Sequence, residues 1–455
     1  MALVYNWAAG HLSHTALVAL PPFFNKISEI TRASQQKPVN SLPTNTMSDA
    51  KPQTPAKKRK RINVRRPDVM EKVQAEVQRH YESSIVEKIR ANDGILTVGN
   101  TTVKLARQFG FCYGVERAID LAYAAHKVFS DKRIFLIGEI IHNQEVNRQL
   151  DDMNIVSLPW KEMNEQYDQL TEEDVVIVPA FGAPTSYIDK IEERGAAIVD
   201  TTCGDVMKVW RRVRGYAKDG FTSIIHGKSG HEEARATASR ALGDKKDGHY
   251  IVILTLADTD FLCDYFAGKV TAAQLMERFG DAASDGFDPE KHLTKVGVAN
   301  QTTMLKSETE EIQKRVCKSI IARDGNSANF QFFDTICGAT QERQDALFEM
   351  LKGHMDVLLV VGGYNSSNTT HLVEIGQEEL PTFFIQNSDR ITSLEEIIHF
   401  DLEQKTEVTT QYANILDTNE KVVIGITAGA SCPNNLIEST IKRVFELRGI
   451  SPDSL

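Results

Sequence analysis

Three cysteines in this chain share one local pattern. Each stands between an apolar, strand-like run and the start of a helix: "FGFCYGVERAI" holds Cys112, "DTTCGDVMKVW" holds Cys203 and "FFDTICGATQERQDAL" holds Cys337. A thiol at a helix N-terminus lies at the positive end of the helix dipole, which lowers its pKa and favours the thiolate that ligates metals. The pattern therefore predicts that three thiolates converge on an iron–sulfur cluster or a zinc ion.

The number of thiolates indicates what such a metal site would do. Cubane clusters in proteins usually have four cysteine ligands, so three ligands would leave one iron open to react. The alternative is that each cysteine is a small buried hydrophobic residue, because free cysteine is among the most buried residue types. We favour ligation because the three cysteines occupy equivalent positions.

These equivalent positions belong to an internal repeat that begins near residue 103. In each unit the cysteine and its helix are followed by an apolar strand that ends in polar groups, at His142, His231 and Asn365. These residues come thirty, twenty-eight and twenty-eight positions after the cysteine of their unit. A further strand follows at 174–184, 295–304 and 421–433. We therefore predict an α/β fold of three pseudo-threefold-related βαβ units, with small parallel sheets around a central iron–sulfur cavity.

The repeat also sets the expected division of the chain. Residues 68–92 indicate an amphipathic helix and residues 94–106 a hairpin. The expected segments are a disordered extension at 1–66, a helix and hairpin at 67–102, lobe 1 at 103–200, lobe 2 at 201–333 with an insertion near 256–290, and lobe 3 at 334–455.

Composition excludes several classes of function. Of the 455 residues 25% are charged and the net charge is −10, yet residues 51–66 carry eight basic and no acidic side chains, which leaves −18 for the rest. A body that negative is a poor nucleic-acid binder, so the basic run is typical of a solvated linker. The sequence has no run of eighteen apolar residues, so it predicts no membrane-spanning helix. The six scattered cysteines indicate a reducing compartment rather than a disulfide framework.

Polar residues gather at the strand ends that would line the cavity. They are His142, His231 to Glu233, Asn300 to Thr303, Tyr364 to Asn368 and Thr427 to Ser431. Neutral and cationic donors with glycine-rich turns suit a phosphate or diphosphate, and the lack of a Walker motif means that a nucleotide is not implied. Each cluster alone is equally typical of a turn or a helix N-cap, so the prediction rests on their shared place in the repeat.

Eight motifs together resemble the 4-hydroxy-3-methylbut-2-enyl diphosphate reductase family, in its longer plastid and cyanobacterial form. They are "GFCYGVERAI", "GEIIHNQEVN", "DTTCGDVMKV", "GHEEARAT", "ANQTTMLKSETEEI", "TICGATQERQDA", "VVGGYNSSNTTHL" and "GITAGAS", between about residues 85 and 447. The resemblance implies the last step of the methylerythritol phosphate route to isoprenoids. It also implies one [4Fe–4S] cluster per chain, held by Cys112, Cys203 and Cys337, whose apical iron binds the substrate's C4 hydroxyl.

The resemblance further implies a role for each polar residue. Glu233 would donate the proton, with Glu232 as runner-up, and Thr302 would assist proton delivery or orient the hydroxyl. The residues implied in substrate binding are His142, His231, Thr302, Ser366, Ser367, Asn368 and Ser431. The implied electron donor is ferredoxin or flavodoxin with its NADPH-dependent reductase, and the implied state is a monomer or homodimer. A general acid beside a buried anion should have a raised pKa.

Two positions depart from the family pattern. Phe181 and Gly182 stand where many bacterial members have a histidine, which puts one diphosphate contact in doubt. Cys432 follows Ser431 and would be a fourth cluster ligand if it faced the cavity, but we expect it to pack beneath the turn. Cys263 and Cys317 are expected to be structural.

Alternatives of other classes remain. One is a zinc- or phosphate-binding protein without redox activity, which would be colourless where an iron–sulfur protein is brown. Another is a cluster-bearing dehydratase, which needs no reductant. The expected location is a bacterial cytoplasm, because residues 1–46 lack the arginine enrichment of a transit peptide; a plastid stroma is the alternative, and Met47 is a second plausible start.

Overall fold

The computed structural model describes residue 62, residues 64–411, residues 420–452 and residue 455. The expected disordered extension, the transit-peptide question and the choice between Met1 and Met47 lie almost wholly outside these residues.

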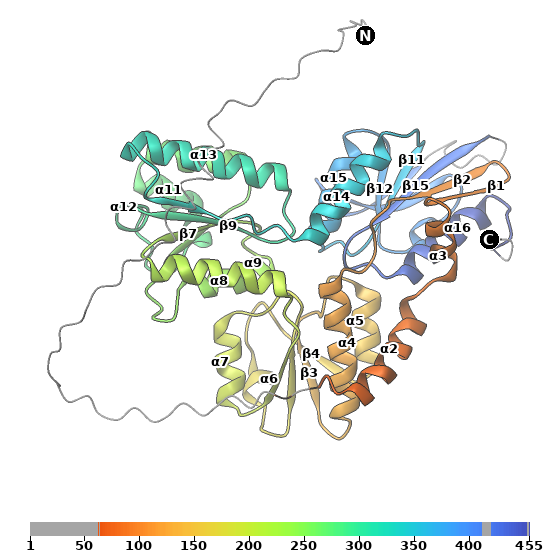
Figure 1. Ribbon diagram of the computed structural model, residues 1–455, viewed down its shortest axis with the longest axis horizontal. Helices are drawn as coiled ribbons and strands as arrows, with labels where there is room; N and C mark the ends of the chain where they lie inside the picture. Colours follow the sequence, from red (N-terminus) through yellow and green to blue (C-terminus); the bar gives the residue numbers. More distant parts are fainter. Residues whose placement is uncertain (1–61, 63, 412–419, 453–454) are drawn as a thin grey trace, which may run out of the picture. The chain divides into compact units, whose positions relative to one another are not determined.

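Three small sheets form the framework, in accordance with the predicted α/β fold (Figure 1). The first sheet has the order β4(Ile155–Leu158), β3(Ile134–Ile137), β5(Val175–Val178), β6(Ala197–Asp200). The second has the order β10(Phe330–Phe332), β9(Val296–Asn300), β7(Thr222–His226), β8(Tyr250–Ile253). The third has the order β1(Ile95–Val98), β2(Thr101–Leu105), β15(Val422–Ala428), β11(Val357–Val361), β12(Thr382–Ile385). All neighbours are parallel except β1 and β2.

Helices connect these strands, as parallel pairing requires. They are α4(Tyr113–Val128), α5(Gln144–Asp152), α6(Glu165–Asp168), α7(Thr185–Glu193), α8(Gly204–Lys218), α9(Glu232–Ala241), α13(Lys306–Asp324), α14(Gly338–Leu351), α15(Ser367–Gln377) and α16(Asn434–Leu447). The expected insertion contains α10(Leu256–Phe266), α11(Ala272–Phe279), η1(Gly280–Ala282) and α12(Pro289–His292). The short η2(Ser388–Arg390) precedes a separate hairpin of β13(Glu396–Asp401) and β14(Thr406–Gln411). Figure 1 shows α8 and α13 on opposite faces of the second sheet.

Each cysteine helix leaves one sheet and packs on the next. The strands that precede the three cysteines are β2, β6 and β10, which belong to the third, first and second sheets. Helix α4 instead shares a core with β3 and β5 of the first sheet. In α8, the Tyr216 hydroxyl donates to the carbonyl of Val298 in the second sheet at 2.9 Å. In α14, Leu347 packs with Leu358 and Val360 of the third sheet. The cysteines therefore stand where the chain passes between sheets.

The N-terminal part differs from the expected single helix. Residues 68–92 form two helices, α2(Pro67–Tyr81) and α3(Ser84–Ala91). Glu82 is extended, and the Ser83 hydroxyl accepts a hydrogen bond from the backbone N–H of Val86, which starts the second helix. The predicted hairpin is confirmed as β1 and β2, and β2 pairs with β15, so it extends the third sheet.

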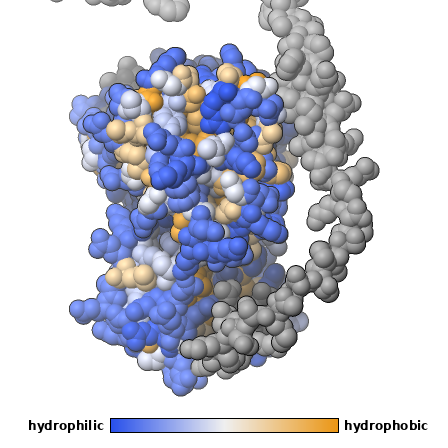
Figure 2. Space-filling model, turned by 90° about the vertical axis from the view of Figure 1, so that its left-hand side faces the viewer, coloured by the Kyte–Doolittle hydropathy of each residue, from blue (hydrophilic) through white to orange (hydrophobic). Residues whose placement is uncertain are grey.

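In the described part of the chain no helix has the length and apolar character to cross a membrane. The face drawn in Figure 2 is mainly hydrophilic, and its hydrophobic residues are scattered.

Candidate active site

The three cysteines have equivalent environments. Each is the N-cap of a helix, and each donates its backbone N–H to a carbonyl two residues past the end of a strand. The three bonds are Cys112 to Ala430 at 3.2 Å, Cys203 to Ala180 at 2.8 Å and Cys337 to Thr302 at 3.1 Å. The pseudo-threefold relation expected from the repeat is therefore present in the hydrogen bonds themselves.

Two of the thiols flank one glycine. A Cβ atom on Gly114, in the first turn of α4, would lie 2.6 Å from the Sγ of Cys203 and 3.8 Å from the Sγ of Cys112. Real side chains do not approach so closely, so only glycine lets these two sulfurs lie against the helix backbone. This arrangement of free thiols fits a shared metal group.

The pKa values of two thiols differ from the expectation that helix dipoles would lower them. Burial raises the pKa of Cys203, and it raises the pKa of Cys337 to about 12. The backbone N–H of Thr340 donates to the Cys337 sulfur at 3.3 Å. This hydrogen bond lowers the pKa of the thiol, but it only partly opposes the increase caused by burial. Desolvation thus outweighs the hydrogen bonds to the sulfur when no cation is present, whereas a bound metal deprotonates its thiol ligands outright.

A buried arginine joins two of the cysteine segments. Arg343 of α14 is 3% exposed, and its guanidinium donates to the carbonyls of Gly110 at 2.6 Å and Ala339 at 2.8 Å. Among the described residues no carboxylate lies within ion-pair distance of it, and its Nε has no partner. Burial lowers the pKa of Arg343, and the largest opposing influences are Cys112 and Cys337 in their thiolate forms. A buried cation without a carboxylate partner fits a neighbouring group of thiolates that carries net negative charge.

The other cysteines lie away from this group. Cys432 is fully buried in the core of the third sheet, with Phe109 and Ile437, and its Sγ is 3.7 Å from the carbonyl of Pro433. The expectation that it packs beneath the turn is confirmed. Cys263 and Cys317 pack against the core between the second sheet and its helices, as expected of structural residues.

Glu233 and Thr302 form the most buried acidic contact of the site. The carboxylate accepts from the Thr302 backbone N–H at 2.6 Å and from its hydroxyl at 3.0 Å. Glu233 is 3% exposed, and burial raises its pKa to about 7 although both bonds from Thr302 lower it. A carboxyl group that is half protonated near neutral pH suits a general acid, as expected.

Two histidines from different lobes meet beside this acid. The Nε2 atoms of His142 and His231 are 3.2 Å apart, and His231 Nδ1 accepts from the backbone N–H of Glu233 at 3.1 Å. This acceptor role places the proton of neutral His231 on Nε2, which donates to His142. His142 then carries its proton on Nδ1, which donates to Glu139 at 3.0 Å. Burial lowers the pKa of His231, so its ring is neutral.

Glu232 completes a group that resembles a metal site. Its carboxylate is 3.6 Å from His142 Nε2, and ligand atoms of His142, His231 and Glu232 all lie within 4.8 Å of one another. However, His231 Nε2 carries the hydrogen, because its Nδ1 accepts from a backbone amide. A protonated nitrogen cannot ligate a metal, so the group is better suited to an anion that accepts hydrogen bonds.

The turn that lacks the family histidine supports His142 instead. The Phe181 ring stacks on His142 with centroids 4.7 Å apart and planes at 13°. Gly182 has φ +80°, and a Cβ there would lie 2.3 Å from the ring of Trp210. The turn therefore fixes the orientation of His142 through stacking and offers no imidazole of its own.

The predicted hydroxyl and amide residues of lobe 3 are buried at the start of α15. Ser366 is its N-cap, and Ser367 accepts from the amide of Gln301 at 3.1 Å. Asn368 accepts from the backbone N–H of Ala430 at 2.9 Å, while its own NH₂ group has no partner among the described residues. The Ser431 hydroxyl donates to the carbonyl of His142 at 3.2 Å. These contacts link all three lobes around the predicted diphosphate site.

Several residues of the site were not predicted from the sequence. They are Glu139, Gly114 and Arg343. Glu139 stands three residues before His142 in the motif "GEIIHN", whereas Gln301 belongs to the predicted run Asn300 to Thr303. Arg343 gave no signal, because an arginine in an amphipathic helix is usually exposed.

Comparison with known proteins places the chain in a family. A sequence model described as "LytB protein" matches residues 103–445. Two curated relatives, both named 4-hydroxy-3-methylbut-2-enyl diphosphate reductase, are from Gloeobacter violaceus and Thermosynechococcus vestitus. They are 46% and 43% identical, over 83% and 84% of this chain and 90% and 93% of theirs.

A solved structure shares the fold. It is titled as the E-1-hydroxy-2-methyl-but-2-enyl-4-diphosphate reductase from Plasmodium falciparum, with a TM-score of 0.55, 21% identity, and coverage of 77% of this chain and 90% of that chain. The likeness agrees with the α/β fold of small parallel sheets. The matched sequence model and the curated relatives confirm the resemblance of the motifs, and the chain therefore belongs to the LytB protein family.

Proposed function

We propose that this chain reduces (E)-4-hydroxy-3-methylbut-2-enyl diphosphate to isopentenyl diphosphate and dimethylallyl diphosphate, the last step of the methylerythritol phosphate pathway. The C4–O bond breaks, two electrons and two protons are taken up, and the hydroxyl oxygen leaves as water. The observation that carries the proposal is the buried, half-protonated Glu233 bonded to Thr302, whose carbonyl accepts from the backbone of Cys337.

The proposed cofactor is one [4Fe–4S] cluster held by Cys112, Cys203 and Cys337. The fit rests on three free thiols at helix N-caps, the side-chain-free Gly114 between two of them and the buried cation of Arg343. When bound, the cluster supplies the electrons and an open iron for the substrate hydroxyl.

The chain's own residues position and protonate the substrate. Glu233 delivers a proton, because its raised pKa keeps a proton available near neutral pH. Thr302 holds that carboxyl through two hydrogen bonds and presents its hydroxyl beside it. Glu232 remains the runner-up as acid, since burial raises its pKa as well.

The diphosphate is bound by donors from the three lobes. Asn368 offers an NH₂ group that has no partner among the described residues, and His231 offers the Nε2–H that otherwise donates to His142. The remaining proposed contacts are His142, Thr302, Ser366, Ser367 and Ser431. A buried trianionic ligand in a negatively charged protein needs such dense hydrogen bonding, because desolvation of its charge would otherwise oppose binding.

The proposed electron donor is ferredoxin or flavodoxin with its NADPH-dependent reductase, and the enzyme acts as a monomer or homodimer. For the location we keep a bacterial cytoplasm, with which the cyanobacterial origin of the two relatives agrees. A plastid stroma is the alternative, and a native host that lacks plastids would exclude it.

Anaerobic reconstitution with iron and sulfide tests the function. Visible absorption and Mössbauer spectra are recorded with and without the hydroxylated diphosphate, followed by turnover with dithionite. We expect a brown protein, one iron site that shifts on adding substrate, and release of both isoprenoid diphosphates. A colourless protein that holds zinc would overturn the proposal, and product formation without any reductant would favour a dehydratase.

A further inference from the structure

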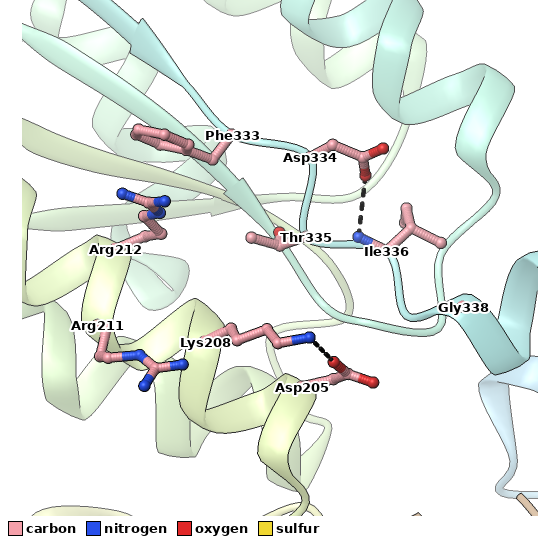
Figure 3. A pocket seen from close by; sticks show the side chains of 9 residues that line it. All are labelled: Asp205, Lys208, Arg211, Arg212, Phe333, Asp334, Thr335, Ile336 and Gly338. Atoms are coloured by element: carbon pink, nitrogen blue, oxygen red, sulfur yellow. Dashed lines mark hydrogen bonds and ion pairs between the residues drawn. The ribbon is translucent and has the colours of Figure 1, made fainter.

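A positively charged pocket lies beside two of the three cysteines. It has a volume of about 450 Å³ and lies between α8 and the loop that leads to α14 (Figure 3). Its lining is Asp205, Lys208, Arg211, Arg212, Phe333, Asp334, Thr335, Ile336 and Gly338. Asp205 is two residues after Cys203, and Gly338 directly follows Cys337, so the pocket opens next to both thiols.

Little protein covers Cys203 and Cys337 next to this pocket. The residue that follows each of the two, Gly204 or Gly338, is exposed. Both are glycines, which have no side chain to cover the sulfur behind them. An electron that reaches the cysteines from solvent therefore has a short path here.

The charge of α8 is opposite to that of the whole protein. The helix carries five lysines and arginines and one acid, whereas the chain has a net charge of −10. Lys208 pairs with Asp205 at 2.6 Å, but among the described residues no carboxylate lies within ion-pair distance of Arg211 or Arg212. Two exposed guanidinium groups are thus available to an anionic surface. A positively charged patch on a negatively charged protein steers an acidic partner to that patch.

The pocket also offers apolar contact. The guanidinium of Arg212 lies 3.5 Å from the centroid of the Phe333 ring, and Ile336 is half-buried beside it. Figure 3 shows the basic side chains of α8 on one side and the loop on the other. Cations at the rim around a small apolar centre are typical of a transient protein interface.

We propose that Lys208, Arg211, Arg212, Phe333 and Ile336 form the docking surface for an acidic one-electron carrier protein, which delivers electrons to the cysteine-held group. The proposal rests on the proposed function, because only a reductase needs such a partner. Charge complementarity and the thin cover over the cysteines favour a carrier protein over a small anion, whose binding would call for buried donors.

Charge reversal on α8 tests the surface. The variant is Arg211→Glu combined with Arg212→Glu. The matched control is Lys314→Glu combined with Lys318→Glu, two exposed lysines of α13 on the opposite face of the same sheet. The probe is an acidic plant-type [2Fe–2S] ferredoxin in its oxidised form, whose Kd is measured at low and high salt. We expect the Kd of the double variant for ferredoxin to be at least about tenfold higher at low salt and to depend much less on salt than that of the wild type. The Kd of the control should be unchanged.

Turnover separates this proposal from the proposed function. With reduced ferredoxin the kcat/KM for the carrier should fall in the double variant, while turnover with dithionite, iron content and visible spectrum stay at the wild-type level. An unchanged Kd for ferredoxin, or equal losses with both reductants, would overturn the docking surface. If the wild type shows no turnover with dithionite, the proposed function fails, and the Kd comparison still decides whether the carrier binds here.

Discussion

Replacing Thr302 by valine should move the pH dependence of catalysis in a direction that simple damage would not. Glu233 has two hydrogen-bond donors, the backbone N–H and the hydroxyl of Thr302. Both stabilise the carboxylate and lower its pKa, against the larger effect of burial, which raises it. Valine has the same shape as threonine and keeps the backbone donor, so Thr302→Val removes one of the two bonds.

The size of the shift follows from the bond that is lost. A hydrogen bond to a charged group contributes about 1.5 kcal/mol or more, and one pKa unit is about 1.4 kcal/mol, so the pKa of Glu233 should rise by about one unit. Its starting value is about 7. At pH 8 the protonated fraction then changes from about one tenth to about one half, a gain of about fivefold.

The assay is the pH profile of kcat/KM with dithionite, which reports ionisations of the free enzyme. Because the acid must be protonated, wild-type activity should decline as the pH rises through about 7. In Thr302→Val the decline should occur about one unit higher, even if the maximum rate is lower. Thr302→Ser keeps the hydroxyl and is the matched control, with its decline at the wild-type pH.

An unshifted or downward-shifted decline in Thr302→Val would refute the reasoning. It would mean that the observed ionisation belongs to another group, with Glu232 the first to examine by Glu232→Gln. Difference infrared spectra of the protonated carboxyl band during a pH titration check the same shift without turnover.

Four further outcomes test other parts of the site. Cys203→Ser should abolish stable iron binding, while Cys432→Ala should retain the full iron content, because Cys432 lies in the hydrophobic core; equal iron loss in both contradicts the assignment of ligands. Gly114→Ala should impair cluster incorporation at an unchanged circular dichroism spectrum, because its Cβ would lie 2.6 Å from the Cys203 sulfur. Arg343→Gln removes a buried cation, so voltammetry should find a more negative reduction potential, and an unaltered potential would contradict its electrostatic role. For Glu233 the folded-state pKa of about 7 exceeds the ordinary 4.5, so its contribution to stability is present below pH 4.5 and is lost as the pH rises to about 7. The free energy of unfolding, measured with urea, should therefore fall from pH 5 to pH 8 by up to about 3 kcal/mol more in the wild type than in Glu233→Gln. An equal fall in the wild type and the variant would contradict the raised pKa of Glu233.

The fold and the positions of the three cysteines could be predicted from the sequence because both depend on local patterns. Continuous apolar strands such as β5 and β11 are fully buried, as parallel sheets between helices require. The repeat of strand, cysteine and helix indicated the three proposed ligand positions. The break between α2 and α3 was missed because Glu82 and Ser83 interrupt a helical period that otherwise continues across them.

The energetics of the site were harder to predict than its residues. Helix dipoles favour thiolates, but the pKa of Cys337 depends more on how much water the fold removes, and burial is a property of the assembled lobes. Arg343 is a further example, because its guanidinium contacts Gly110, which is 233 residues away in the sequence. No local pattern carries information on a contact of that range.

The passage of the chain between sheets links the metal site to the assembly of the lobes. Each cysteine follows a strand of one sheet, donates its N–H to a carbonyl of that same sheet, and starts a helix that packs on the next sheet. Three such junctions converge, so a group bound by all three sulfurs would cross-link every pair of neighbouring lobes at once. Since metal binding and folding share their free energy when the ligands come from separate elements, loss of the cluster should loosen the contacts between lobes before it unfolds any one sheet. The hydrogen bonds that join His142 to His231 and Gln301 to Ser367 lie between the same lobes. The proposed substrate site would therefore depend on a cysteine-held group for its geometry as well as for its electrons.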